Sequence, residues 1–265
     1  MDILSTDGLT KRFGTLTAVD DMTISLTQGE FFGLLGPNGA GKTTAIKMLI
    51  TLLPPTAGSA RVAGYDIKTQ SSEVRRHIGY VPQLLSADGQ LTGFENLLIF
   101  ARLFDVPRGE IRSRAEDALE FMGLQDAADT LVRKYSGGMI RRLEIAQSML
   151  HRPKMLFLDE PTLGLDPVAR RTVWEHLTKL RKDFNTTIMM TTHYMDEADE
   201  LCNRIAIMHL GKVVAIGTPA MLKANIGKEH ATLDDVFTHY SGNSLESSSG
   251  YRETSRIRRA GRRLG

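Results

Sequence analysis

The chain has 265 residues, of which 42% are hydrophobic and 24% are charged, so it has enough apolar material to bury a core. This composition excludes an intrinsically disordered protein, and a formal net charge of only +2 gives no indication of a nucleic-acid partner. The single cysteine, Cys202, has no partner for an internal disulfide, which fits a reducing compartment. No apolar run approaches the roughly 20 residues that span a bilayer, and no signal peptide is predicted at Met1–Leu4, so we expect the chain to stay inside the cell.

The N-terminal region predicts short strands at 24–26 and 30–35, the second apolar enough for a buried central position. A glycine-rich turn follows at once. From Gly41 the apolar residues recur at helical spacing until Pro54 and Pro55 end the helix. A strand, a glycine-rich loop and a helix therefore follow one another directly.

Residues 91–151 have helical periodicity and few strand signals, which predicts a helical subdomain with helices over 94–104, 108–122 and 138–151. Strands and helices then alternate, and this alternation favours an α/β fold with a mostly parallel sheet covered by helices. The strands are expected at 155–158, 187–191 and 204–209, with a helix over 168–182 and a short helix after His193.

The C-terminal part begins with a hairpin turn at 210–212 and continues with small helices within 218–240, at 219–225 and 232–240. We expect one folded domain over 1–240. Residues 241–265 are predicted to be a flexible Ser-rich linker and an Arg-rich tail. The tail holds Arg252, Arg256, Arg258, Arg259, Arg262 and Arg263.

The glycine-rich turn matches the phosphate-binding pattern G-x-x-x-x-G-K-[ST], and its position between a predicted strand and a predicted helix is the context that this chemistry requires. Backbone N–H groups and the helix N-terminus would surround the phosphates, Lys42 would reach the β and γ phosphates, and Thr43 would supply a hydroxyl to Mg²⁺. A chance glycine-rich turn is the alternative. The predicted ATP-binding residues here are Gly36, Pro37, Asn38, Gly39, Ala40, Gly41, Lys42, Thr43 and Thr44.

Two acidic residues, Asp159 and Glu160, follow the apolar run 155–158 at the carboxyl end of a predicted buried strand. Open α/β sheets bind ligands at that edge, so both carboxylates are expected to face the phosphate-binding loop. We predict that Asp159 holds Mg²⁺ and that Glu160 polarises the attacking water as a general base. Solvated acids at a strand end are the common alternative for such a pair taken alone.

Two further polar residues support this site. His193 follows the strand 187–191 and is expected to hydrogen-bond the γ-phosphate, although a lone histidine at such a position is more often structural. Gln83 follows Gly79–Pro82 and would be an ordinary loop glutamine without the other motifs. Together with those motifs, His193 and Gln83 are candidate catalytic residues, and Gln83 is also a candidate metal ligand.

A second helix N-terminus suited to an anion is predicted at Tyr135–Met139, where Ser136 is the expected N-cap. Gly137 and Gly138 permit close approach of the backbone. The chain already contains a complete phosphate-binding loop for its own nucleotide. One physical solution is that this second loop serves the ATP of another subunit.

These motifs stand in the order and spacing of the ATPase subunits of ABC transporters, which the chain resembles from about residue 11 to residue 240. The resemblance implies a P-loop NTPase core with a mostly parallel sheet, an N-terminal antiparallel β subdomain and a helical subdomain. It also implies that Ser136, Gly137, Gly138 and Met139 belong to the signature sequence, which contacts the γ-phosphate held by the opposing subunit. Two subunits would then dimerise head to tail around two Mg-ATP.

Some roles rest on this resemblance alone. Gln83 would lie on the loop that senses Mg²⁺, water and the membrane partner, and Asp166 would line the dimer interface. Phe13 would stack on adenine, where tyrosine is more usual, so a hydroxyl contact would be absent. Met139 replaces the glutamine that often ends the signature, but the serine and the glycine backbone donors remain and hydrolysis is expected to persist.

Met139, with 141–146 and 232–237, resembles the drug-resistance branch of ABC-2 exporters, whose best-known members move anthracyclines. We therefore expect an ATP-hydrolysing subunit that drives a separate transmembrane permease from the cytoplasmic face of the membrane, for export of a drug-like or lipid-like compound. No nucleic-acid partner is expected. The alternatives are a non-transport ABC-type ATPase acting on nucleic acid or ribosomes, and a non-enzymatic binding module, against which Glu160 and His193 argue.

Overall fold

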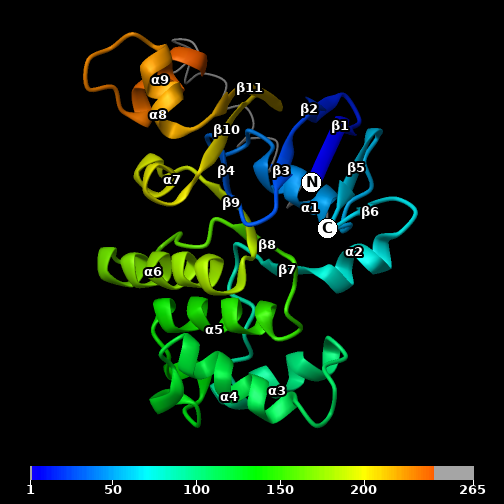
Figure 1. Ribbon diagram of the computed structural model, residues 1–265, viewed down its shortest axis with the longest axis vertical. Helices are drawn as coiled ribbons and strands as arrows, with labels where there is room; N and C mark the ends of the chain where they lie inside the picture. Colours follow the sequence, from blue (N-terminus) through cyan, green and yellow to red (C-terminus); the bar gives the residue numbers. More distant parts are fainter. Residues whose placement is uncertain (1, 242–265) are drawn as a thin grey trace, which may run out of the picture.

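The computed structural model describes residues 2–241 and forms two sheets and a group of helices (Figure 1). The predicted Ser-rich linker beyond Ser241 and the Arg-rich tail lie outside the described residues. Within residues 2–241, none of the helices has both the length and the apolar character needed to cross a membrane.

The N-terminal part forms a five-stranded antiparallel sheet in the order β2-β1-β5-β6, with β3 also paired to β1. The first half of β1 pairs with β3 and its second half with β2, and the pairing with β2 shifts register between Leu9 and Lys11. The sequence predicted only β3 of these strands. They are β1 (Asp2–Phe13), β2 (Leu16–Met22), β3 (Ser25–Thr27), β5 (Ala57–Val62) and β6 (Tyr65–Asp66).

The second sheet has six strands in the order β11-β10-β4-β9-β8-β7, and all its neighbours are parallel except the hairpin of β10 and β11. Every residue of β4, β8 and β9 is buried, as expected for central strands covered on both faces. The predicted mostly parallel α/β sheet is confirmed. Its strands are β4 (Phe31–Leu35), β7 (Ile78–Val81), β8 (Met155–Asp159), β9 (Thr187–Thr192), β10 (Arg204–His209) and β11 (Lys212–Gly217).

The helices lie around and beyond this sheet, with α3 and α4 at one end of the molecule and α8 and α9 at the other (Figure 1). Helix α1 shares one apolar cluster with strands of both sheets, through residues such as Ile46 and Leu49. The α-helices are α1 (Lys42–Leu49), α2 (Ser71–His77), α3 (Gly93–Leu103), α4 (Ile111–Phe121), α5 (Gly137–Met149), α6 (Pro167–Phe184), α7 (Met195–Leu201), α8 (Pro219–Asn225) and α9 (Leu233–Ser241). Short 3₁₀ turns cover Gln125–Ala127 and Val132–Lys134.

One helix boundary was predicted wrongly, and two elements were not predicted. Helix α1 ends at Leu49 rather than at Pro54, because Thr51 adopts a left-handed conformation with φ of 65° that a helix cannot continue. The elements that were not predicted are helix α2 and the edge strand β7.

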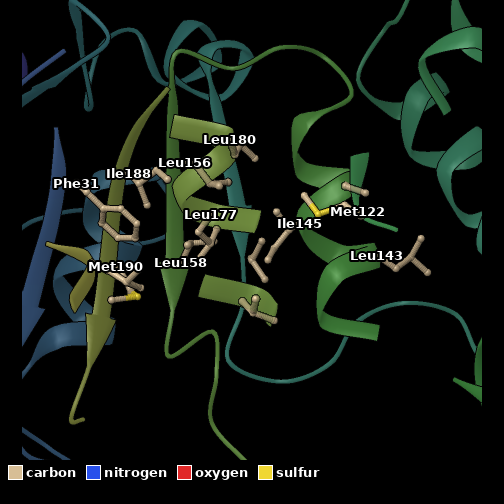
Figure 2. Packing of buried hydrophobic residues seen from close by; sticks show 14 of the residues in the cluster. Phe31, Met122, Leu143, Ile145, Leu156, Leu158, Leu177, Leu180, Ile188 and Met190 are labelled. Atoms are coloured by element: carbon tan, nitrogen blue, oxygen red, sulfur yellow. The ribbon is translucent and has the colours of Figure 1, made fainter. Parts of the chain in front are cut away.

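A continuous apolar cluster joins the parallel sheet to the helical part of the molecule. Figure 2 shows it running from Phe31 on β4, through Leu158 on β8 and Leu177 on α6, to Ile145 on α5 and Met122 beyond α4. All these side chains are at most 1% exposed. Burying each contributes about 1.5 to 3 kcal/mol, so α5 and α6 are firmly attached to the strands that carry the polar residues described next.

Candidate nucleotide-binding and catalytic site

Four loops emerge from the same edge of the parallel sheet. Strands β4, β9, β8 and β7 are neighbours and run parallel, so their carboxyl ends meet. The segments that follow them begin at Gly36, His193, Glu160 and Pro82. Strand order thus brings together polar residues that are far apart in the sequence, at the edge where such sheets bind ligands.

The loop after β4 is folded by its glycines. Gly36, Gly39 and Gly41 have φ angles of 154°, 86° and 107°, which side chains rarely adopt. A Cβ on Gly36 would lie 2.2 Å from the carbonyl oxygen of Met208, and one on Gly41 would lie 2.2 Å from that of Ala18. The loop is therefore held against two strands, and it leads directly into the N-terminus of α1 at Lys42, as an anion-binding loop requires.

Lys42 and Thr43 point back toward the sheet edge. The Lys42 Nζ donates to the carbonyl oxygens of Gly36 and Pro37, at 2.7 and 3.1 Å, and lies 3.4 Å from Glu160 Oε1. Burial lowers the pKa of Lys42, and the Glu160 carboxylate partly offsets that effect. Thr43 Oγ1 donates to Asp159 Oδ1 at 3.0 Å.

Asp159 and Glu160 have separate surroundings although they are adjacent. Asp159 is 1% exposed and accepts hydrogen bonds from the hydroxyls of Thr43 and Thr191, at 3.0 and 2.6 Å. Glu160 has a φ of 50°, and its amide donates to the carbonyl oxygen and the hydroxyl of Thr191. This backbone conformation costs on the order of 1 kcal/mol and turns the Glu160 side chain away from Asp159, toward Lys42.

The Glu160 carboxylate is surrounded by three polar side chains. Besides Lys42, Gln83 Nε2 donates to Glu160 Oε2 at 3.3 Å, and His193 Nδ1 lies 3.3 Å from the same oxygen. Glu160 is 6% exposed, so these neighbours provide most of its surroundings. We call Lys42, Thr43, Gln83, Asp159, Glu160 and His193 the Glu160 cluster.

The chemistry of the donors suits Mg²⁺ beside a phosphate. A hydroxyl and a carboxylate, from Thr43 and Asp159, lie together at the start of α1, and Mg²⁺ prefers such oxygen ligands. In the described part of the chain, no group of three or more His, Cys, Asp or Glu residues could hold a metal by itself. Thr43 and Asp159 would supply two oxygen ligands to such an ion.

The loop 136–139 lies elsewhere on the molecule. Ser136 caps α5 by accepting a hydrogen bond from the amide of Met139 at 3.2 Å, and it is exposed. A Cβ on Gly138 would lie 2.8 Å from the Cβ of Ala169 on α6. Among residues 2–241, no hydrogen bond or ion pair joins 136–139 to the Glu160 cluster.

Asp166 and Phe13 are both exposed. Asp166 caps α6, because its Oδ1 accepts from the amides of Val168 and Ala169 at 3.0 and 2.9 Å. Phe13 ends β1, is 47% exposed, and has Lys11 Nζ 5.2 Å from its ring centroid. The structure brings neither residue into the Glu160 cluster.

Thr191 is a site residue that the sequence analysis missed. It links Asp159 and Glu160 through its hydroxyl, and it lies opposite Asp159 in the register of β8 and β9. A polar residue at the end of a buried strand is the signal that could have identified it. Tyr80 on β7 was also missed, and burial together with the Asp159 charge raises the pKa of Tyr80 to about 12.

A glycine-folded loop between a parallel strand and a helix, with a buried lysine and two acids at the next strand, defines a P-loop nucleotide-binding protein. A family model described as ABC transporter matches residues 19–163, which is more than half of the chain. The chain therefore belongs to the ABC transporter family, and it is an ATP-binding ATPase subunit.

The relatives agree with this assignment. The daunorubicin/doxorubicin resistance ATP-binding protein DrrA of Streptomyces peucetius is 46% identical over 224 residues, covering 84% of this chain and 68% of DrrA. The Nod factor export ATP-binding protein I of Ralstonia nicotianae is 45% identical over 217 residues, covering 82% and 67%. A solved ATP-binding subunit of an ABC transporter superimposes with a TM-score of 0.80 at 28% identity, covering 91% of this chain and all of that one.

Proposed function

We propose that the chain hydrolyses Mg-ATP with Glu160 as general base. The main support for this proposal is the position of the Glu160 carboxylate, which lies beside the phosphate-binding loop between Lys42, Gln83 and His193. In this proposal Lys42 binds the β and γ phosphates, Glu160 accepts the proton of the attacking water, and His193 hydrogen-bonds the γ-phosphate. Phe13 stacks on the adenine, and the backbone of 36–44 binds the phosphates.

Thr43 and Asp159 hold Mg²⁺ in this proposal, with Gln83 as a further ligand. The ion would neutralise charge that develops on the phosphate oxygens during hydrolysis. The hydrogen bond between Thr43 and Asp159 supports this assignment, because it already brings two oxygen ligands together.

Two copies of the chain are proposed to enclose two ATP molecules. The loop 136–139 exposes a helix N-terminus and, within residues 2–241, makes no hydrogen bond or ion pair to the Glu160 cluster, so it would complete the site of the partner copy, with Asp166 at the interface. Residues 1–240 would form the ATPase domain, with the helical subdomain at about 91–151.

The ATPase pair is proposed to drive a transmembrane permease from the cytoplasmic face of the membrane. Opening and closing of a two-chain interface supplies a motion that a docked permease follows. The exported compound would be drug-like or lipid-like, as the names of the daunorubicin-resistance and Nod factor export relatives suggest.

The test is ATP hydrolysis by the purified chain at several protein concentrations, with and without Mg²⁺. We expect a rate per chain that rises with concentration, because the complete site needs two chains. Glu160→Gln should reduce hydrolysis by about 10² to 10⁴ while retaining ATP binding, since it removes the base but keeps a similar shape. An active Glu160→Gln variant would overturn the catalytic assignment.

A further inference from the structure

The largest fully buried side chain of the described residues is that of Arg141, on the helix that begins with the loop 136–139. Its Nη1 donates to the carbonyl oxygen of Pro82 at 2.7 Å and to Glu144 Oε2 at 3.0 Å. Its Nη2 donates to the carbonyl oxygen of Gln83 at 2.9 Å. One guanidinium group thus binds the backbone at the residue that contacts Glu160.

Glu144 binds the other end of the same loop. Its Oε1 accepts hydrogen bonds from the amide and from the hydroxyl of Ser86. Arg141 and Glu144 are each 2% exposed in their side chains. The ion pair therefore joins α5 to both ends of the segment 82–86, whose residues Leu84 and Leu85 are themselves 81% and 50% exposed.

Stability alone does not account for this arrangement. A buried ion pair is often no more stabilising than apolar residues of the same volume, because both charges lose water. Burial lowers the pKa of Arg141, because loss of water disfavours its charged form. Within residues 2–241, the buried Arg141 Nε has no hydrogen-bond partner, and this increases the free-energy cost of burying the side chain.

We propose that Arg141 and Glu144 are positioning residues that hold the segment 82–86 against α5, so that the Gln83 side chain stays beside Glu160. The inference rests on the proposed function of Gln83 and deepens it. Because α5 also carries 136–139 at its N-terminus, a displacement of that helix by a partner's nucleotide moves Gln83 as well. The pair thereby links the two ATP sites.

The test uses the full chain and replaces the pair by apolar residues of similar size, Arg141→Met with Glu144→Leu. Arg142→Met is the matched control, because Arg142 is on the same helix and donates to the carbonyl oxygens of Met122 and Gly123, away from Gln83. Gln83→Ala removes the side chain that the pair is proposed to position, and it shows the effect of losing that side chain altogether. Three quantities are measured for each variant. They are the temperature of thermal unfolding, the amide hydrogen exchange of 82–86 without nucleotide, and the Mg²⁺ concentration that gives half-maximal hydrolysis.

We expect the double variant to stay folded, yet to exchange the Ser86 amide about tenfold faster, as loss of one hydrogen bond implies. Its half-maximal Mg²⁺ concentration should rise as in Gln83→Ala, and that of Arg142→Met should not. If the double variant does not fold, Arg141→Lys decides, because a single nitrogen then replaces the two nitrogens, Nη1 and Nη2, that bind the carbonyl oxygens of Pro82 and Gln83.

Unchanged exchange of the Ser86 amide in the folded double variant would overturn the positioning role, and so would an unchanged Mg²⁺ midpoint in the double variant or in Arg141→Lys. A wild type without hydrolysis would instead overturn the proposed function, and the exchange of 82–86 would still test whether the pair holds the loop.

Discussion

The Glu160 cluster and the loop 136–139 are both suited to phosphate, but they differ in how their polar groups are satisfied. Lys42 and Glu160 are 4% and 6% exposed, and their ion pair joins the start of α1 to the residue that follows β8. Ser136 is exposed, and its hydroxyl accepts a hydrogen bond from Met139 in the first turn of its own helix. In the proposed function, the first region supplies a base, a cation and metal ligands from one chain. The second region would present amide donors to a nucleotide bound by the partner copy.

The largest expected effect comes from removing the cation of the Glu160 cluster. Lys42→Ala should lower Mg-ATP affinity and reduce hydrolysis by at least about 10², because one buried donor to the phosphates is lost. Equilibrium nucleotide binding and steady-state hydrolysis measure the two effects. Lys47→Ala, an exposed lysine on the same helix, is the control and should leave both unchanged. Wild-type affinity in Lys42→Ala would refute the assigned role.

Asp166 tests whether α6, the helix next to Gly138 of the loop 136–139, is stabilised by its own N-cap. Asp166→Ala should lower the free energy of unfolding by about 1 kcal/mol, because the N-cap of α6 is lost, and Asp166→Asn should lower it by less. Denaturant unfolding of the nucleotide-free chain measures both. Equal stability of the two variants and wild type would mean that the cap contributes nothing in the isolated chain.

Glu197 gives a smaller effect that depends on pH. It is fully buried, and its Oε1 accepts from the Thr162 hydroxyl and the Trp174 indole at 2.8 and 2.9 Å. Burial raises the pKa of Glu197 above 4.5, so the folded state holds this proton more tightly than the unfolded state does. Its favourable contribution is thus complete below pH 4.5 and is lost as the pH rises through the raised value.

The corresponding variant is Glu197→Gln, which stays neutral and keeps an acceptor for both donors. Its free energy of unfolding relative to wild type should therefore become more favourable as the pH rises above 4.5. Denaturant unfolding across the pH range measures the difference. A difference that does not vary with pH would contradict the raised pKa.

The parallel sheet was predictable because its strands are short apolar runs that alternate with amphipathic helices. The site motifs were predictable because glycines, lysine and acids stand directly after such strands. The long strand β1 was not, since it pairs with β2, β3 and β5 through register shifts that no local pattern encodes.

Tertiary contacts explain why the sequence analysis did not identify the remaining polar residues. Arg141 and Glu144, three positions apart on a helix, have the spacing of a solvated surface pair, yet both are buried because the segment 82–86 covers them. Thr191 looks like an ordinary strand residue until the register places it opposite Asp159. These polar contacts therefore depend on the packing of segments that are distant in the sequence, which local sequence patterns do not predict.

The most direct test of a site completed by two chains is hydrolysis by a mixture of two damaged variants. Lys42→Ala damages the phosphate-binding region, and Gly138→Val damages the loop 136–139, since a Cβ there would lie 2.8 Å from that of Ala169. Each should be nearly inactive alone. Random pairing in a two-fold dimer leaves one intact site in half the dimers, so the mixture should regain up to about a quarter of the wild-type rate. A mixture no more active than the sum of its components would contradict the account.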